Sequence, residues 1–238
     1  MNIPTIATYI AIALLVAAFG ILVTVSERRR DKALRAFASE VGFSPVNEVP
    51  SELLPGGGTV GSAMEGTISR RRVVLFDWGS TTGRGRHRKT HVTTVAAFAA
   101  PGTLPQFELR KKTLLTFGER QVLFQDDPAF SKKLRLSGPD ENAIHQLFSP
   151  QLRDFLVSEL AAKKFQIKGL GDYILIYQLH KRVSGAKYRG FFQDASQVAE
   201  GLLERYTRYE GGRSGLSSGL KPGGGKSANS VLSPGEVL

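Results

Sequence analysis

An uncharged and largely apolar run, IPTIATYIAIALLVAAFGILVTV, occupies residues 3–25 near the start of the chain. As an α-helix, about 23 residues would span about 34 Å, which is enough to cross a bilayer. A secretory signal peptide would carry a basic segment before the run and a small-residue cleavage site after it. No Lys or Arg precedes this run. The sequence therefore predicts an uncleaved transmembrane helix over 3–25.

Basic residues gather on only one side of this run. The side that follows it carries Arg28, Arg29, Arg30, Lys32 and Arg35. Because cytoplasmic flanks carry the excess of Lys and Arg, we expect the N-terminus outside and everything after residue 26 in the cytoplasm. The chain contains no cysteine. This agrees with a reducing compartment and excludes a disulfide scaffold, a thiol nucleophile and any Cys-ligated metal site.

Helical periodicity continues beyond the apolar run. Leu34, Phe37, Ala38 and Val41 recur at helical spacing, with charged residues between them. This pattern predicts a juxtamembrane amphipathic helix over 27–43, for which Gly42 is a plausible stop. Residues 44–59 then carry three prolines and a run of glycines, which predicts an irregular connection.

The next part of the chain is typical of a mostly antiparallel sheet. Residues enriched in β-branched and aromatic side chains predict strands over 64–69, 71–78 and 91–99, the last two joined as a long hairpin. Shorter strands are expected at 107–115, 121–125 and 132–136. The turn residues of 169–171 predict a second hairpin made of 165–168 and 172–180.

Helices are expected between and after these strands. Residues 141–148 follow a Pro-Asp pair, and a second helix, capped by Ser149 with Pro150 in its first turn, extends to about residue 162. A last helix is expected over roughly 187–206. The fold class predicted is α+β, with a transmembrane helix followed by a cytosolic domain over 44–208 of mostly antiparallel sheet with flanking helices. The Gly- and Ser-rich composition of 209–238 predicts a disordered tail.

The charge of the chain indicates an anionic partner or surface. The chain has 32 Lys and Arg against 21 Asp and Glu, a formal net charge of +11. The most basic stretch lies in the loop between the first long hairpin's strands and includes Arg84, Arg86, Arg88 and Lys89. Guanidinium groups and backbone N–H groups in such a loop could hold a phosphate or a lipid headgroup. A solvated hairpin tip with no ligand is the alternative.

A second basic cluster, Arg70, Arg71 and Arg72, stands at the start of the same hairpin. Together with the juxtamembrane arginines, these side chains could face the anionic inner leaflet, where each cation is worth about 1 kcal/mol. The sequence thus predicts an anion or headgroup site from both clusters.

No catalytic signature is present in the chain. Asp77 interrupts an apolar strand, so it could act as a base, but pairing with an arginine of the facing strand is the better interpretation. His87 and His91 are the other candidates for catalysis, as members of one site with Asp77. No cofactor and no metal ion are expected, and Asp126-Asp127 before Pro128 is interpreted as turn and helix-cap chemistry.

The cytosolic part resembles a known family. The stretch LFDWGSTTGRGRHRKTHVTTVAAF, then LPQFELRKK, DDPAFSKKLRLSGPDENAIHQLFSPQLRDF and GDYILIY are similar to uncharacterised bacterial membrane-anchored proteins, a domain of unknown function with a TGxGxxxxTHxxTV-like stretch. The resemblance covers about residues 60–180. It implies the bacterial inner (plasma) membrane as location and carries no catalytic residues.

These observations together predict a non-enzymatic, membrane-tethered interaction or scaffolding module. Its expected partners are the membrane, through the N-terminal anchor, and an anionic lipid or acidic protein. One alternative is an enzyme that acts on a phosphorylated or membrane-bound substrate near the basic loop. The other is a membrane-tethered nucleic-acid binder, for which no recognised motif is present. The oligomeric state cannot be deduced from the sequence.

Overall fold

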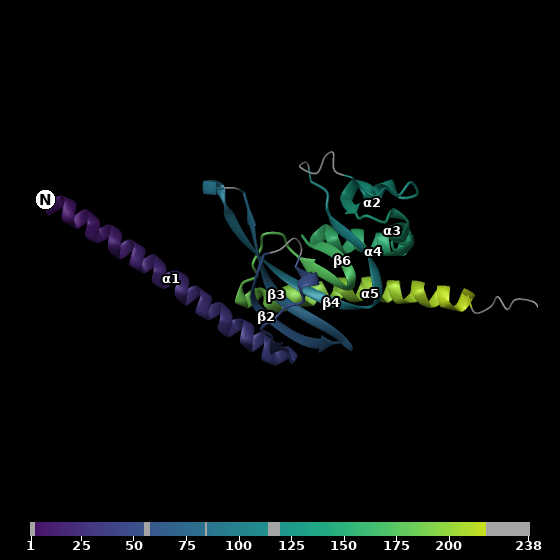
Figure 1. The fold of residues 1–238 in the computed structure, drawn as a ribbon, viewed down its shortest axis with the longest axis horizontal. Helices are drawn as coiled ribbons and strands as arrows, with labels where there is room; N and C mark the ends of the chain where they lie inside the picture. Colours follow the sequence, from purple (N-terminus) through teal and green to yellow (C-terminus); the bar gives the residue numbers. More distant parts are fainter. Residues whose placement is uncertain (1–2, 55–57, 84, 114–119, 218–238) are drawn as a thin grey trace, which may run out of the picture.

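A computed structural model describes residues 3–54, 58–83, 85–113 and 120–217. Its first element, α1 (Ile3–Val41), is one continuous helix that contains both the apolar run and the amphipathic segment (Figure 1). Within it, Ala11–Val41 includes a window of mean hydropathy 1.8, so this helix is apolar and long enough to cross a membrane. The apolar side chains from residue 11 to residue 25 are exposed, as expected of a surface that lipid would cover.

Helix α1 ends as the sequence predicts. Gly42 adopts a φ of +72°, and the Phe43 N–H donates a hydrogen bond to the Ala38 carbonyl at 2.7 Å. This is a left-handed C-terminal cap, which glycine adopts without a steric penalty. Leu34, Phe37 and Ala38 on the last turns are buried in the main core. The amphipathic segment is therefore part of the folded domain rather than a separate element.

In the described part of the chain the sheet has six strands, and every pair of neighbouring strands is antiparallel. Five strands follow the order β1-β2-β3-β4-β5, and the sixth pairs with the other edge of β4. The central strand β4 pairs with β3 along its first half and with β5 near its end. The strands are β1 (Ser44–Pro45), β2 (Thr59–Ile68), β3 (Arg71–Thr82), β4 (Lys89–Lys111), β5 (Leu134–Ser137) and β6 (Gln166–Tyr177). The α+β architecture that the sequence predicted is thus confirmed.

Strand β6 corrects one predicted element. Residues 165–180 do not form a hairpin, because β6 continues through the glycines of 169–171 and pairs with β4 on both sides of them. A Cβ at Gly169 would lie 2.3 Å from the Phe107 ring, so this glycine lets an aromatic ring lie against the strand. Gly171 has a φ of +57° where the pairing register shifts. The glycines mark irregularities of one strand rather than a turn.

The structure also corrects the strands that were predicted before this segment. The strands expected at 91–99 and 107–115 belong to the single strand β4, with register shifts between them, and residues 114–115 lie outside the described residues. Residues 121–125 form no strand, although the Val122 N–H donates to the Leu136 carbonyl at 2.8 Å. The predicted strand at 132–136 begins as helix α2 (Pro128–Lys133) and continues as β5.

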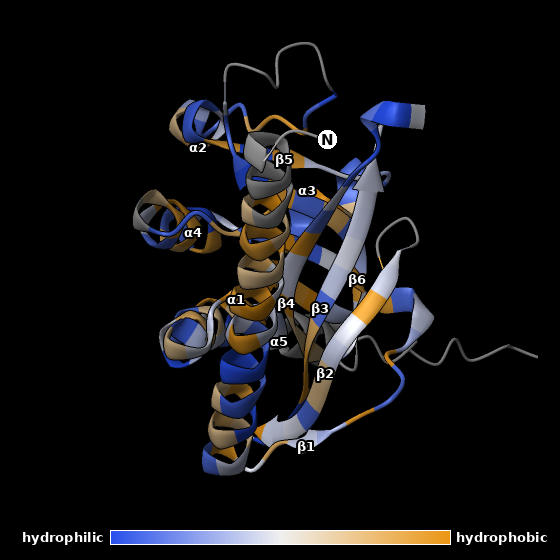
Figure 2. Cartoon of the chain, turned by 90° about the vertical axis from the view of Figure 1, so that its left-hand side faces the viewer, coloured by the Kyte–Doolittle hydropathy of each residue, from blue (hydrophilic) through white to orange (hydrophobic). Residues whose placement is uncertain are grey.

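The two faces of the sheet are covered differently. Val73 and Leu75 of β3 point toward the helices, whereas Val74 and Phe76 point to the opposite face. Figure 2 shows the helices along one side of the sheet. The opposite face is covered by the segment that contains the 3₁₀ turn η1 (Ser51–Leu53), whose Leu53 is fully buried. The irregular connection predicted over 44–59 therefore covers part of the core.

Side-chain caps define the starts of three helices. Asp127 caps α2, accepting a hydrogen bond from the Phe130 N–H at 2.9 Å. Asp140 and Ser149 cap α3 (Glu141–Leu147) and α4 (Pro150–Ala162) in the same way. These caps confirm the interpretation of Asp127 and the predicted start of α4.

The last helix is longer than predicted. Helix α5 (Tyr188–Ser217) follows the 3₁₀ turn η4 (Gly185–Lys187) and continues well past residue 206. The helix thus includes 209–217, which the sequence assigned to a disordered tail. The rest of that tail, 218–238, lies outside the described residues.

Candidate functional site

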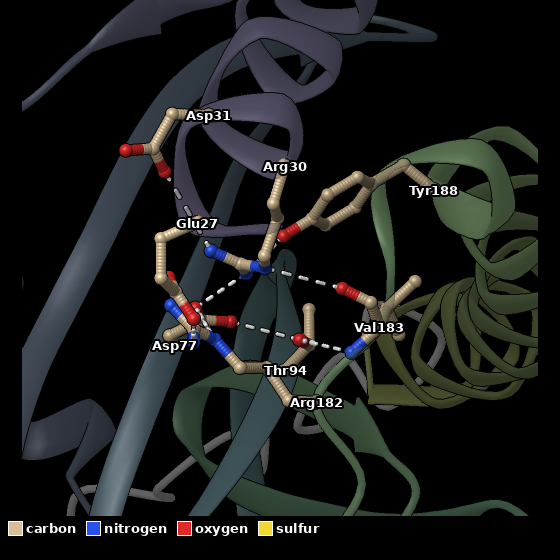
Figure 3. Close-up of polar contacts among 8 residues, drawn as sticks. All are labelled: Glu27, Arg30, Asp31, Asp77, Thr94, Arg182, Val183 and Tyr188. Atoms are coloured by element: carbon tan, nitrogen blue, oxygen red, sulfur yellow. Dashed lines mark hydrogen bonds and ion pairs between the residues drawn. The ribbon is translucent and has the colours of Figure 1, made fainter. Parts of the chain in front are cut away.

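A cluster of charged side chains lies where the apolar helix meets the sheet (Figure 3). Asp77 follows Val73 and Leu75 on the helix-covered face of β3 because alternate residues of a strand share a face. At that position it lies beneath Arg30 of α1, five residues after the apolar run ends at Val25. The Arg30 Nη2 is 2.5 Å from the Asp77 Oδ2. Only 8% of the Arg30 side chain and 3% of the Asp77 side chain are exposed.

Asp77 accepts three hydrogen bonds from three different parts of the chain. Besides Arg30, its donors are the Arg182 Nε at 3.1 Å and the Thr94 hydroxyl at 2.8 Å. The sequence predicted an arginine partner on the facing strand. The prediction of an arginine partner is confirmed, but the predicted location is wrong. Arg30 comes from α1, and Arg182 comes from the segment after β6. The facing strand β4 supplies a hydroxyl instead.

Arg30 is enclosed on several sides. Its Nε donates to the Val183 carbonyl at 3.3 Å, and its Nη2 also contacts the Tyr188 hydroxyl. The guanidinium carbon lies 5.4 Å from the centre of the Tyr188 ring, within the range of a cation–π contact. Burial is the main cause that raises the pKa of Tyr188, followed by the negative charge of Asp77. The phenol therefore stays neutral over the physiological pH range.

A second ion pair extends the cluster along α1. The Arg182 Nη1 lies 2.6 Å from the Glu27 Oε1, one helical turn before Arg30. Burial lowers the pKa of Arg182, but hydrogen bonds to Glu27 and Asp77 outweigh this effect and raise it. Arg182 thus bridges a carboxylate of α1 and a carboxylate of β3.

The segment between β6 and α5 completes the joint. The Val183 N–H donates to the Thr94 hydroxyl at 2.9 Å, and the Thr94 N–H donates to the Lys181 carbonyl at 3.1 Å. A Cβ at Gly185 would lie 2.4 Å from the Ala33 Cβ, so this segment packs closely on α1. We call the group of Glu27, Arg30, Asp77, Arg182 and Tyr188 the joint cluster. Because it joins α1, β3 and the start of α5, it holds the apolar helix and the sheet as one unit.

Only part of this cluster could be predicted from the sequence. An aspartate within an apolar strand and an arginine run directly after an apolar helix were both visible. No spacing rule connected Asp77 with Arg30 or Arg182, or Arg30 with Tyr188, because these contacts are 47, 105 and 158 positions apart.

The basic loop forms the tip of the long β3–β4 hairpin. Gly83 has a φ of +84°, and a Cβ there would lie 2.3 Å from the His87 carbonyl oxygen, so only glycine fits this tight turn. Arg86, Arg88 and Lys89 are exposed, and we call them the basic tip. Arg84 lies outside the described residues. In both overall views the tip lies on the same side of the domain as the apolar half of α1 (Figures 1 and 2).

The second basic cluster lies at the opposite end of the same hairpin. Arg70 lies in the β2–β3 turn, and Arg71 is the first residue of β3. Strand β3 is 12 residues long. At about 3.3 Å per residue the two clusters are about 36–40 Å apart. Arg72 is also engaged, with its Nε 2.7 Å from Glu65 and its Nη1 3.1 Å from the Tyr173 hydroxyl. The sequence grouped the two clusters into one surface, and the structure places them at opposite ends of one hairpin.

The three alternative catalytic candidates do not converge. His91 pairs with Ser80 in the sheet and lies on the face opposite to Asp77, since its neighbours at 95 and 97 belong to the other core. There its ring stacks on His180, with 4.1 Å between ring centres. His87 lies exposed in the turn η2 (Gly85–His87) at the tip. The single site that the enzyme alternative required is absent from the described residues.

The remaining acidic pair is also structural. Arg153, whose side chain is 5% exposed, lies 2.5 Å from Asp126 and 3.1 Å from Asp127. Within the described ranges, no three His, Asp or Glu side chains gather as a metal-binding group.

Comparisons with known proteins give little further information. No family model matches the chain, and no curated protein sequence matches it. Among solved structures, the chain is similar to the mycobacterial trehalose monomycolate transport factor A, TtfA. The TM-score is 0.49 and the identity 16%, over 74% of this chain and 93% of that chain. A similarity at this level carries no inference about function.

Proposed function

We propose that the protein is a non-enzymatic, membrane-tethered interaction module that presents the basic tip to an anionic membrane surface. Helix α1 supplies the anchor, and the joint cluster fixes the sheet relative to it. The observation that carries this proposal is the position of the basic tip on the side of the domain from which the apolar half of α1 extends (Figure 1).

The chemistry of the basic tip suits such a surface. Arg86, Arg88 and Lys89 are exposed and make no salt bridge within the described residues. Each cation near an anionic membrane surface is worth about 1 kcal/mol. The hairpin is stiffened by continuous pairing of β3 and β4 from Val73 to Thr82. The tip can therefore contact the membrane without a large loss of conformational entropy.

The topology follows from the same proposal. Arg28, Arg29 and Arg30 follow the apolar run, so the N-terminus lies outside and the domain lies in the cytoplasm of a bacterial cell. The resemblance to bacterial membrane-anchored proteins of unknown function supports this placement.

The test uses the full chain in nanodiscs made with zwitterionic lipid alone or with added acidic lipid. Because the chain has no cysteine, His87→Cys introduces a single thiol at the tip for an environment-sensitive fluorophore. We expect acidic lipid to protect this fluorophore from an aqueous quencher. The Arg86→Gln/Arg88→Gln variant should lose the protection.

The chain offers a matched control at the other end of β3. The Arg70→Gln/Arg71→Gln variant removes the same amount of charge far from the tip and should keep the protection. Equal loss in both variants would contradict a contact made by the tip. Protection by added DNA or RNA instead of acidic lipid would favour nucleic-acid binding and overturn the proposal.

A further inference from the structure

A cavity of about 410 Å³ lies beside the joint cluster, between α1 and the segment that precedes α5. From α1 it is lined by the apolar Leu22 and Val25 and, further along the helix, by Ser26, Arg29, Arg30 and Ala33. The opposite wall is formed by residues 184–186. One wall of the cavity therefore changes from apolar to cationic within about two helical turns.

This change falls where the apolar run ends. Leu22 is 68% exposed and Val25 is 38% exposed, and both belong to the segment that is apolar enough to cross a membrane. Arg29 is exposed and makes no salt bridge within the described part of the chain. A membrane that covers Leu22 and Val25 would place its headgroups beside Arg29.

The opposite wall offers hydrogen-bond donors and further positive charge. Ser184 precedes η4 but its hydroxyl makes no capping hydrogen bond, which leaves it able to bind a ligand oxygen. Ser184 and Ala186 also line an adjacent cavity of about 440 Å³, together with Lys181 and Lys187. Cations thus lie on both sides of the segment 184–186.

The buried guanidinium adds an independent observation. Arg30 lines the same cavity, and its Nη1 is buried without a hydrogen-bond acceptor. The Asp31 carboxylate lies 3.9 Å from that nitrogen, which is beyond hydrogen-bond distance. A buried donor without an acceptor is uncommon in folded proteins, and the residue that carries it lines this cavity.

We propose that this cavity binds one acidic phospholipid from the leaflet that faces the domain. Its phosphate lies beside Arg29 and Ser184, and one acyl chain lies along Leu22 and Val25. The proposal depends on α1 being in a membrane, but not on the basic tip, which lies elsewhere on the domain. A bound lipid of this kind would fasten α1 to the segment before α5, next to the joint cluster.

The test is photocrosslinking of the full chain in nanodiscs. The probes are a phosphatidylglycerol and a phosphatidylcholine that carry the same diazirine-bearing acyl chain, and the crosslinked residues are located by mass spectrometry. We expect crosslinks on 22–29 and 184–186, with phosphatidylglycerol favoured over phosphatidylcholine. The Arg29→Gln variant should reduce this preference about fivefold, the effect of one near-surface cation.

Arg28→Gln provides the matched control. Arg28 is the neighbouring exposed cation and does not line the cavity, so this variant should keep the preference. A second variant, Ala186→Leu, adds bulk at an exposed position of the cavity wall and should reduce crosslinking of both lipids there. Neither Arg29 nor Ala186 is buried, so both variants should fold.

Three outcomes would overturn the proposal. Equal crosslinking of the two lipids would mean that no acidic headgroup is selected. Equal losses in Arg28→Gln and Arg29→Gln would indicate diffuse attraction rather than a site. Crosslinks of α1 to a second protein chain, in place of lipid, would mean that a protein occupies the cavity. If acidic lipid fails to protect the fluorophore at the basic tip while these lipid crosslinks remain, only the proposed function is contradicted.

Discussion

The Arg30 guanidinium and the Asp77 carboxylate form a buried ion pair, with 2.5 Å between Nη2 and Oδ2, although they lie 47 positions apart. One residue belongs to the helix that carries the apolar run and the other to the centre of the sheet. Buried ion pairs are costly to break because the remaining charge has no counter-charge. This pair therefore couples the apolar helix to the domain.

Replacing Asp77 should strongly destabilise the domain. The Asp77→Asn variant keeps the shape of the side chain but leaves the buried Arg30 without a buried negative partner. We expect the free energy of unfolding to fall by about 3–5 kcal/mol, measured by denaturant titration of the full chain in mild detergent. Combining Asp77→Asn with Arg30→Gln should cost less than the sum of the two single changes.

Asp31→Asn is the control for this prediction. Asp31 also lies near Arg30, but at 3.9 Å and with 49% of its side chain exposed. Its removal should change the free energy of unfolding by no more than about 1 kcal/mol. Equal effects of Asp31→Asn and Asp77→Asn would contradict the importance of the buried pair.

The close packing of Gly185 on α1 gives a second prediction. Because a Cβ there would lie 2.4 Å from the Ala33 Cβ, Gly185→Ala must push the segment away from the helix. We expect a loss of about 1–3 kcal/mol in the free energy of unfolding. Gly190→Ala is the control, since a Cβ at Gly190 in α5 meets nothing within 4 Å and should stabilise the helix slightly. A neutral Gly185→Ala would refute the tight contact.

The β2–β3 turn gives a third prediction. Ser69 and Arg70 both have left-handed φ values, +48° and +64°, between the paired residues Ile68 and Arg71. This is the geometry of a two-residue hairpin turn, in which glycine is preferred. Arg70→Gly should raise the free energy of unfolding by about 1 kcal/mol. Arg71→Gly, within the strand, should lower it, and the same sign for both changes would count against the prediction.

The stacked histidines make the base of the tip sensitive to pH. Burial is the main cause that lowers the pKa of His180, helped by the nearby His91 and Lys89. The pKa of histidine in the unfolded chain is about 6.5, and the pKa of His180 in the folded chain is lower. The stability that the neutral ring contributes is therefore fully present above about pH 6.5 and is lost as the pH falls through the folded pKa. Acidification should therefore lower the hydrogen-exchange protection factors, which correct for the intrinsic pH dependence of exchange, in 178–183 and in the first residues of β4.

The matching variant is His180→Asn. Residue 180 has a φ of +56°, and Asn tolerates this left-handed backbone better than most residues. The variant should lose most of the pH dependence of the protection factors in this region. If the protection factors respond to pH as strongly in His180→Asn as in the natural chain, the stacked pair is not the cause.

The local parts of the fold could be predicted from the sequence because short-range chemistry determines them. Gly42 ends α1, Asp127 and Ser149 cap helices, and alternating residues of β3 divide between two faces. The glycines of 169–171 were misinterpreted, because only the Phe107 ring, more than 60 positions earlier in the chain, explains the absence of a side chain at Gly169.

The candidate site was less accessible to sequence reasoning. The basic tip could be recognised from its composition. The position of Arg70 and Arg71 at the far end of β3 could not, because it depends on the length and direction of the hairpin. The partners of Asp77 depend on how α1 and the segment after β6 pack on the sheet, and no local pattern records that packing.

The most direct test of the account is whether α1 and the sheet move as one body. Spin labels on Val23→Cys and His87→Cys in the full chain, reconstituted in lipid, report the distance from the apolar helix to the basic tip. We expect one narrow distance distribution, as narrow as that of a Ser69→Cys/His87→Cys pair within the sheet, and a broad one once Asp77→Asn is added. A broad distribution in the chain with Asp77 intact would show that α1 is only a flexible tether and that the joint cluster does not hold it to the sheet.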